Sequence, residues 1–219
     1  MNSHRRGFSL VEMVMLVLVL GLFLTGILSL LSSTMGNFTK QEESIFCAGE
    51  ASLLITQLNH DFESLIKRGA IPGTFPDTFS QAKAAAMYQP AAGLLAFQIL
   101  GSGGAEDVQY SFDQSEKSIT RNCGTHQVTI GKGRIASFSF YWQILGTDGL
   151  VRSFPSDPDT VIEPPLPVDM KVGRCWGKVA LTLESPKTTQ AGKKQVKQEY
   201  RFRVFPVRFN NELRSICAE

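Results

Sequence analysis

The chain of 219 residues has room for one domain of ordinary size and an additional segment. Its hydrophobic content of 43% and charged content of 19% are typical of a protein that folds around a core, and they exclude a disordered chain. Lys and Arg total 22 against 20 acidic residues, and the net charge of +2 argues against nucleic acid as a partner along the length of the chain.

The first predicted element is an apolar helix. The segment from Met13 to Leu31 contains no charged residue and no proline. At about 1.5 Å per residue, such a helix spans about 28 Å, close to the hydrocarbon thickness of a bilayer. A cleavable secretory signal has a shorter apolar region, and residues 29–33 resemble its cleavage site only weakly. The segment therefore predicts a retained single-pass anchor, with secretion of a soluble product as the alternative.

The flanks of this segment predict its orientation. Arg5 and Arg6 precede it, whereas Lys40 after it is offset by Glu42 and Glu43. Basic residues favour the cytoplasmic side of a membrane. We expect the N-terminus in the cytoplasm and the remaining chain across the membrane. In a bacterium, this places the helix in the inner membrane and the remaining chain in the periplasm.

The residues before the apolar segment form an ordered signature, Arg5-Arg6-Gly7-Phe8-Ser9-Leu10-Val11-Glu12. An ionised side chain at the head of a lipid-soluble helix costs several kcal/mol unless it is paired. Glu12 therefore needs a partner or must reach the membrane surface. An ordinary signal anchor with a chance glutamate is the alternative interpretation.

This signature resembles the class III signal of type IV prepilins and pseudopilins. The resemblance implies that a prepilin peptidase cuts between Gly7 and Phe8, that the new amino terminus of Phe8 is methylated, and that the apolar helix remains in the mature protein. It also implies that Glu12 pairs with the amino terminus of a neighbouring subunit during assembly.

The helix is predicted to continue beyond the apolar segment. Apolar residues recur at spacings of three and four at Ala48, Ala51, Ile55, Leu58, Phe62 and Leu65. Gly69 supplies a stop, and Lys67 and Arg68 before it suit the negative end of the helix dipole. The predicted organisation is a leader at 1–7, a transmembrane and assembly helix at 8–34, an amphipathic continuation at 35–68, and a periplasmic head at 69–219.

The head is predicted to contain antiparallel strands, because the apolar period changes from 3.6 to two. The longest segments are Arg134–Ile144, Gly177–Glu184 and Val196–Phe205, with shorter strands at Leu94–Leu100, Val108–Phe112, Ser118–Arg121 and Gln127–Ile130. One small helix is expected at Ala82 to Met87 and an exposed Pro-rich loop at 154–167. The predicted fold class is α+β, and the long helix packed on an antiparallel sheet resembles the pilin fold.

Four cysteines lie far apart and form no CxxC pair, namely Cys47, Cys123, Cys175 and Cys217. This spacing argues against a zinc site. In an oxidising compartment, one or two disulfides are expected, and four cysteines allow three complete pairings. The sequence does not choose among them.

No set of residues in the sequence has the spacing of a catalytic, cofactor or metal site. The three histidines lack spaced ligand partners, and Asp148, Asp157 and Asp159 match no calcium loop. The sequence thus predicts neither an enzyme nor a cofactor. A basic cluster is interpreted as the solvated face of an edge hairpin rather than as a phosphate-binding surface, and it comprises Lys193, Lys194, Lys197, Arg201 and Arg203.

Together, these patterns predict a minor pilin or pseudopilin, and the strands of the head resemble those of the J-type minor pseudopilin of type II secretion systems. The resemblance implies as partners the prepilin peptidase and N-methyltransferase, other pilins or pseudopilins, an inner-membrane assembly platform and membrane lipid. The subunit would then enter a type II secretion pseudopilus or a type IV pilus. The alternative is a single-span adhesin or a DNA-uptake binding module.

Overall fold

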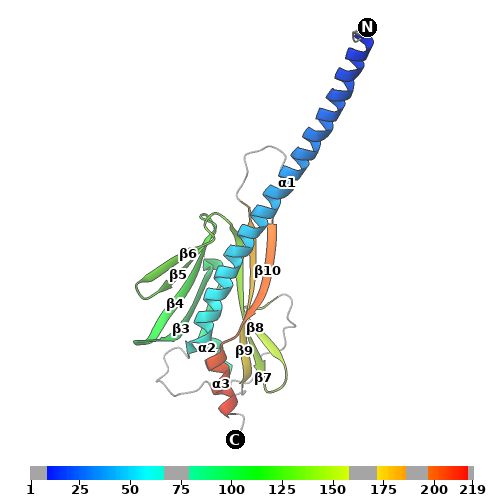
Figure 1. The fold of residues 1–219 in the computed structure, drawn as a ribbon. Helices are drawn as coiled ribbons and strands as arrows, with labels where there is room; N and C mark the ends of the chain where they lie inside the picture. The colour runs from blue at the N-terminus through cyan, green and yellow to red at the C-terminus, as the bar shows by residue number, and fades with distance from the viewer. Residues whose placement is uncertain (1–8, 67–78, 158–171, 186–196, 217–219) are drawn as a thin grey trace. The chain divides into compact units, whose positions relative to one another are not determined.

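The computed structural model describes residues 9–66, 79–157, 172–185 and 197–216. The chain divides into two compact units, residues 1–43 and residues 44–219. The described residues combine a long N-terminal helix with antiparallel sheets, so the fold class is α+β as predicted. We call the second unit the head; it contains the C-terminal part of the long helix and all the described strands (Figure 1).

The long helix α1 runs from Leu10 to Glu63 over 54 residues. It ends before the predicted stop at Gly69, because the chain turns at Ser64 and joins a sheet. Leu65 and Ile66 form strand β1, in which Leu65 pairs with Ile99 and Ile66 pairs with Gln98. The Ser64 carbonyl accepts a hydrogen bond of 2.9 Å from the Leu100 N–H. Pairing with a strand thus decides where this helix ends.

One sheet is built from consecutive hairpins. Its strands are β1 (Leu65–Ile66), β2 (Ala86–Gln89), β3 (Leu94–Gly101), β4 (Gly104–Asp113), β5 (Ser118–Cys123) and β6 (His126–Ile130). The order is β1-β3-β4-β5-β6, and β2 pairs with β3 beside β1. At the β4–β5 turn, the Asp113 carboxylate accepts backbone hydrogen bonds from Ser115 and Glu116.

The second sheet has the order β10-β9-β7-β8, all antiparallel. Its strands are β7 (Ile135–Gly146), β8 (Val151–Phe154), β9 (Val172–Glu184) and β10 (Lys197–Val204). Phe138, Phe140 and Trp142 share the buried face of β7, as the alternation predicted. The alternation also predicts a buried Ala136, but a register shift lies between Ile135 and Ser137, and Ile135 is buried instead.

Two further helices complete the described chain. Helix α2 spans Phe79–Ala85, so the small helix begins before the predicted Ala82, and Ala86 and Met87 belong to β2 instead. Helix α3 spans Val207–Ile216, where the sequence predicted no element. Of the predicted Pro-rich loop at 154–167, Phe154 ends β8 and Asp157 is buried, and residues 158–167 lie outside the described part of the chain.

The core of the head lies between the two sheets and one face of α1. Phe62 on α1 approaches Phe97 of the first sheet at 4.7 Å between ring centroids and Phe140 of the second at 5.7 Å. The buried face of α1 differs from the predicted stripe, because Ala48 is exposed, Ile55 is half-buried, and Cys47 and Leu54 are fully buried instead. The face is therefore rotated toward positions that contact both sheets.

Candidate functional site

The described chain begins with a closed hydrogen-bonded cap on α1. The Glu12 carboxylate accepts a hydrogen bond of 2.9 Å from the Ser9 backbone N–H. The Ser9 hydroxyl accepts one of 3.3 Å from the Glu12 backbone N–H. This reciprocal arrangement is a capping box, which satisfies two N–H groups that a helix start leaves without partners. Glu12 thus has a hydrogen-bond partner, Ser9, at the start of its own helix.

The predicted processing residues precede this cap in the sequence. Gly7 and Phe8 lie outside the described residues, so the predicted cut between them stays a prediction. The first helical hydrogen bond joins the Met13 N–H to the Ser9 carbonyl at 3.2 Å. The helix therefore begins at Leu10, and the positive end of its dipole lies at Ser9 and Leu10.

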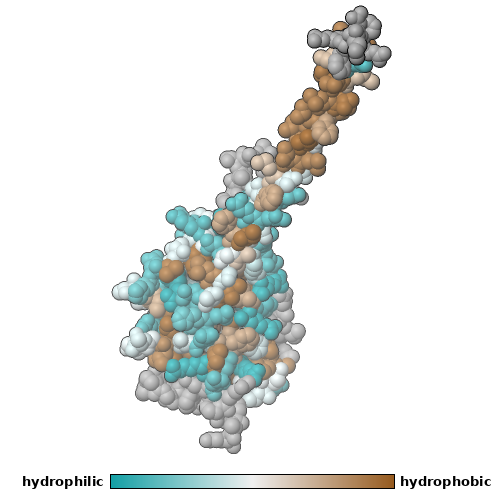
Figure 2. Space-filling view, viewed as in Figure 1, coloured by the Kyte–Doolittle hydropathy of each residue, from teal (hydrophilic) through white to brown (hydrophobic). Residues whose placement is uncertain are grey.

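The residues that follow Glu12 expose apolar side chains on every side of the helix. No charged residue occurs between Glu12 and Lys40. Leu16, Leu20 and Phe23 are 54%, 55% and 69% exposed, and Figure 2 shows this segment of α1 in the colour of hydrophobic residues. Length and composition allow this helix to cross a membrane. An all-round apolar surface of this kind is typical of a helix surrounded by lipid or by other helices.

Two threonine hydroxyls in this part of α1 bond to the helix itself. The Thr25 hydroxyl donates to the Gly21 carbonyl, and the Thr34 hydroxyl donates to the Leu30 carbonyl at 2.8 Å. Because each hydroxyl is satisfied four residues back, neither imposes the cost of an unpaired donor in lipid.

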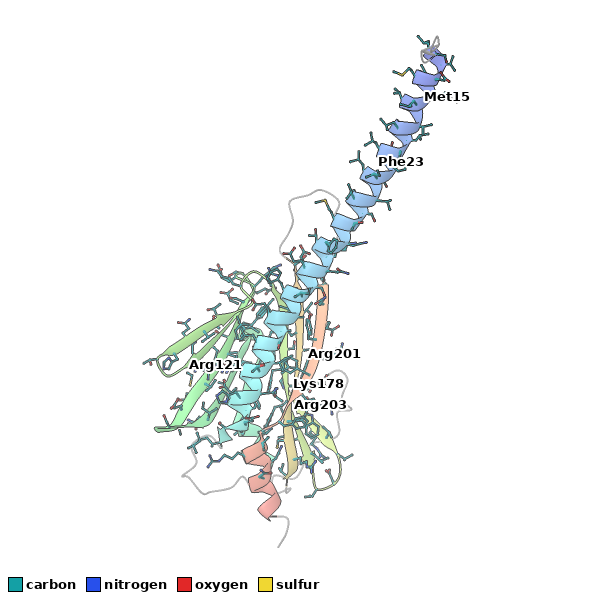
Figure 3. All side chains as sticks on the ribbon, in the orientation of Figure 1. Met15, Phe23, Arg121, Lys178, Arg201 and Arg203 are labelled. Atoms are coloured by element: carbon teal, nitrogen blue, oxygen red, sulfur yellow. The ribbon has the colours of Figure 1, made fainter. Side chains whose placement is uncertain are left out.

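Met15 and Phe23, labelled in Figure 3, line a shallow apolar groove on the helix surface.

In the head, a buried ion pair ties α1 to the first sheet. Asp61 is 2% exposed and accepts hydrogen bonds of 2.6 and 2.7 Å from Nε and Nη2 of Arg121 on β5. The Tyr110 hydroxyl on β4 donates to the same carboxylate at 2.6 Å. Gln57, one turn earlier on α1, completes the set at 3.4 Å. The bidentate geometry matches the planar guanidinium to the carboxylate.

Asp61 and its buried surroundings shift the pKa values of the two side chains that donate to it, Tyr110 and Arg121. Burial, followed by the charge of Asp61, raises the pKa of the Tyr110 phenol well above its usual value of 10. The hydrogen bonds to Asp61 raise the pKa of the Arg121 guanidinium further above its already high value. Both shifts hold the groups in the protonated forms that donate to the carboxylate. The arrangement is suited to fixing α1 on the sheet.

A second polar cluster lies on the other sheet. Asp157 is 1% exposed and forms an ion pair of 2.6 Å with Lys178 on β9. Gln143 on β7 donates to Asp157 at 3.2 Å and accepts from the Trp176 indole at 2.5 Å. Asp148, by contrast, pairs with Arg152 at 2.6 Å. Each of these two aspartates is thus engaged by a cation of the chain itself.

Glu184 of β9 engages part of the predicted basic cluster. It lies 2.8 Å from Lys197 and 2.9 Å from Lys117, and these two hydrogen-bonded amines lower the pKa of its carboxyl. Arg201 pairs with Glu199 at 2.7 Å. Lys193 and Lys194 lie outside the described residues.

The structure places three of the four cysteines in the head. Cys123 on β5 donates to the Glu106 carboxylate at 3.4 Å, and Cys175 on β9 is buried, which raises the pKa of its thiol. Cys47 is buried on α1. Cys217 lies outside the described residues, so the disulfides remain a prediction.

Within the part of the chain that the structure describes, no group of three or more His, Cys, Asp or Glu side chains gathers in a way that could hold a metal ion. His60 and His126 are both exposed, and His4 lies outside that part.

No family model, no curated protein and no solved structure matches the chain.

Proposed function

We propose that this chain is a minor pilin or pseudopilin, a structural subunit that is cut after Gly7 and assembled through its N-terminal helix. The observation that carries the proposal is the capped start of α1. Glu12, bonded to Ser9, is the last charged residue before Lys40, and an exposed apolar helix follows it directly. A carboxylate at this place can exchange its Ser9 N–H for a free amine nearby, because both are donors at the same end of the helix.

In this proposal the apolar segment has two successive environments. It resides in the bacterial inner membrane as a single span, with the N-terminus cytoplasmic and the head periplasmic. It is then transferred into a secretion pseudopilus or a pilus, where helices of neighbouring subunits replace lipid. The peptidase, the sister subunits and the assembly platform are the proposed partners. The chain acts by assembly and not by catalysis.

The DNA-uptake alternative is less favoured by the charges of the head. Two cations of the basic cluster, Lys197 and Arg201, are already paired with Glu184 and Glu199. Phosphate binding would have to compete with these carboxylates. Strong salt-dependent binding of DNA by the purified protein would revive this alternative.

The first test is the mature N-terminus. Mass spectrometry of the protein purified from membranes should find a chain that begins at methylated Phe8. Gly7→Leu should accumulate as an uncut precursor, with Ser3→Leu in the leader as a matched control that is cut normally. A native chain that begins anywhere other than Phe8 would overturn the proposal.

The second test separates the charge of Glu12 from its capping role. Glu12→Gln keeps a side-chain oxygen that can accept from Ser9 but removes the charge, since glutamine also serves in capping boxes. Ser9→Ala removes the hydroxyl half of the cap and keeps the charge. We expect Glu12→Gln to lower incorporation into filaments or complexes at least tenfold and Ser9→Ala to lower it much less. Equal incorporation of Glu12→Gln and the wild type would exclude an ionic role for Glu12.

A further inference from the structure

The head carries a long strand at the edge of its second sheet. Strand β10 pairs with β9 along Lys197–Val204, and in the described part of the chain no other strand pairs with its opposite side (Figure 1). In an antiparallel ladder, every second residue of such a strand directs its N–H and C=O away from the sheet. With eight residues, β10 is longer than the other edge strands β1, β2, β6 and β8.

The two faces of this strand have opposite character. Glu199, Arg201 and Arg203 point outward and are exposed, with 53% and 58% of the Glu199 and Arg201 side chains accessible. Tyr200 and Phe202 point inward, where they pack against the core but remain only half-buried. Part of the apolar surface of these two rings is therefore still accessible to water, and a strand added beside β10 would cover it.

The outward face has a specific pattern of charge. Arg201 and Arg203 are two residues apart, so they lie on the same face at a spacing of about 7 Å. Figure 3 labels both, together with Lys178 of β9, which is opposite Arg203 in the register. The Arg203 guanidinium also lies 6.0 Å from the Trp176 ring. Arg201 pairs with Glu199 of the same strand at 2.7 Å, and Lys178 pairs with Asp157 at 2.6 Å. An acidic side chain of a partner would therefore compete with Glu199 for Arg201.

We propose that β10 is a docking edge for an extended segment of another protein, which adds to the sheet as a further strand with alternating acidic and apolar residues. Acidic side chains of the segment would lie opposite Arg201 and Arg203, and apolar side chains would cover Tyr200 and Phe202. Charges on an edge strand oppose indiscriminate pairing, and a partner with complementary charges escapes that opposition. The partner segment is thereby defined by its alternation of acidic and apolar residues and by a charge pattern complementary to that of β10.

This inference does not depend on the proposed N-terminal processing. It uses only residues of the head, and its test leaves Gly7, Phe8 and Glu12 unchanged. A native chain with an uncut leader would contradict the proposed function and leave the docking edge intact. Conversely, failure of the docking test would leave the proposed function intact.

The test uses the full chain in detergent micelles and a fluorescent peptide, Val-Glu-Val-Glu-Val-Lys-Val-Glu, which places Glu opposite both arginines and Lys opposite Glu199 in an antiparallel register. The matched controls are the charge-swapped peptide and the same peptide N-methylated at alternate residues. Fluorescence anisotropy should give at least tenfold weaker binding for the charge-swapped peptide. N-methylation should weaken binding by a similar factor, because it removes the backbone donors.

The decisive variant is the double replacement Arg201→Glu with Arg203→Glu, which should reverse the preference so that the charge-swapped peptide binds better. Amide hydrogen exchange should show protection of residues 197–204 on peptide binding. Equal affinity for the two charge patterns, or unchanged binding after N-methylation, would overturn the proposal. Tighter binding of oligothymidylate than of either peptide would also overturn it, in favour of a nucleic-acid surface.

Discussion

One helix of this protein has two halves with opposite relations to water. In the first unit, residues 10–31 of α1 present apolar side chains on all sides, and none of the described residues there is buried. In the head, the same helix buries Leu54, Leu58 and Phe62 completely, together with the ion-paired Asp61. The same secondary structure thus serves two different surroundings, and the difference lies only in the distribution of side chains around it.

The comparison shows where the stability of each half originates. The head half is held by a packed core and by the Asp61 ion pair. The first half has hydroxyl bonds within the helix and a capping box at its start. Its apolar side chains are exposed in the described residues, which is typical of a helix surrounded by lipid or by other helices. Variants in one half should therefore act on folding and variants in the other on membrane residence or assembly.

The largest expected effect is loss of the buried carboxylate. Asp61→Ala leaves the Arg121 guanidinium, whose side chain is 11% exposed, without its counter-ion. We expect the free energy of unfolding of the head to fall by about 3–5 kcal/mol, because removal of one partner strands a buried charge. Urea denaturation followed by tryptophan fluorescence would measure this. Glu63→Ala, an exposed change on the same helix, should alter it by less than about 0.5 kcal/mol.

The next effect concerns the first half. Leu20→Lys places a cation in the middle of the apolar segment and should cost about 3 kcal/mol of membrane insertion free energy. The fraction of protein that stays in membranes after an alkaline carbonate wash would report this loss. Leu53→Lys is the matched control, since Leu53 is 51% exposed in the head half. If both variants behaved alike, the proposed division of α1 would be wrong.

A smaller effect should appear at high pH, in the head only. The pKa of the Tyr110 phenol is raised in the folded state, so above pH 10 the unfolded chain loses this proton while the folded chain keeps it. Stability from this group is therefore complete below pH 10 and falls above it by about 1.4 kcal/mol per pH unit. Unfolding at pH 9 and pH 11 would measure the slope. The Tyr110→Phe variant should lack the part of this slope that comes from the phenol. An identical slope in the two proteins would contradict the assignment of the slope to Tyr110.

The smallest effect is expected at the start of α1. Ser9→Ala removes the hydroxyl that accepts the Glu12 N–H and should destabilise the first turn by about 1 kcal/mol. Amide exchange at residues 10–13 should accelerate about fivefold, whereas exchange in the head should not change. Ser9→Thr, which retains a capping hydroxyl, should restore slow exchange. Acceleration in the head would mean that the two halves are coupled.

Local patterns predicted much of the fold because they act over few residues. The alternation in β7, β9 and β10 gave strands close to the observed ones, and the uncharged segment gave the helix. Strand β1 was missed because its two residues are specified by pairing with β3. Strand β8 was also missed, since its four residues are too short to show a period. Helix α3 was missed as well, and the Asn210 side chain fixes it to Cys175 through two bonds of 2.8 Å.

Some residues of the candidate site could likewise be predicted from a local pattern, and others could not. Ser9 and Glu12 stand three residues apart, and this spacing by itself contains the capping signature, although the sequence interpretation did not use it. Gly7 and Phe8 remain predictions from the sequence. Asp61 had no signal, because its partner Arg121 lies on a distant strand and a polar residue on a helix is ordinarily solvated.

The sequence by itself determined that a long helix exists, that its first half is apolar throughout, and that the head contains strands with one buried face. These properties depend on the order of polar and apolar residues along a regular backbone. Only the tertiary structure decided which face of α1 is buried, which carboxylates are paired, and which strand lies at the edge of a sheet. Those properties depend on residues far apart in the chain that meet only after folding, and no local pattern records such a meeting.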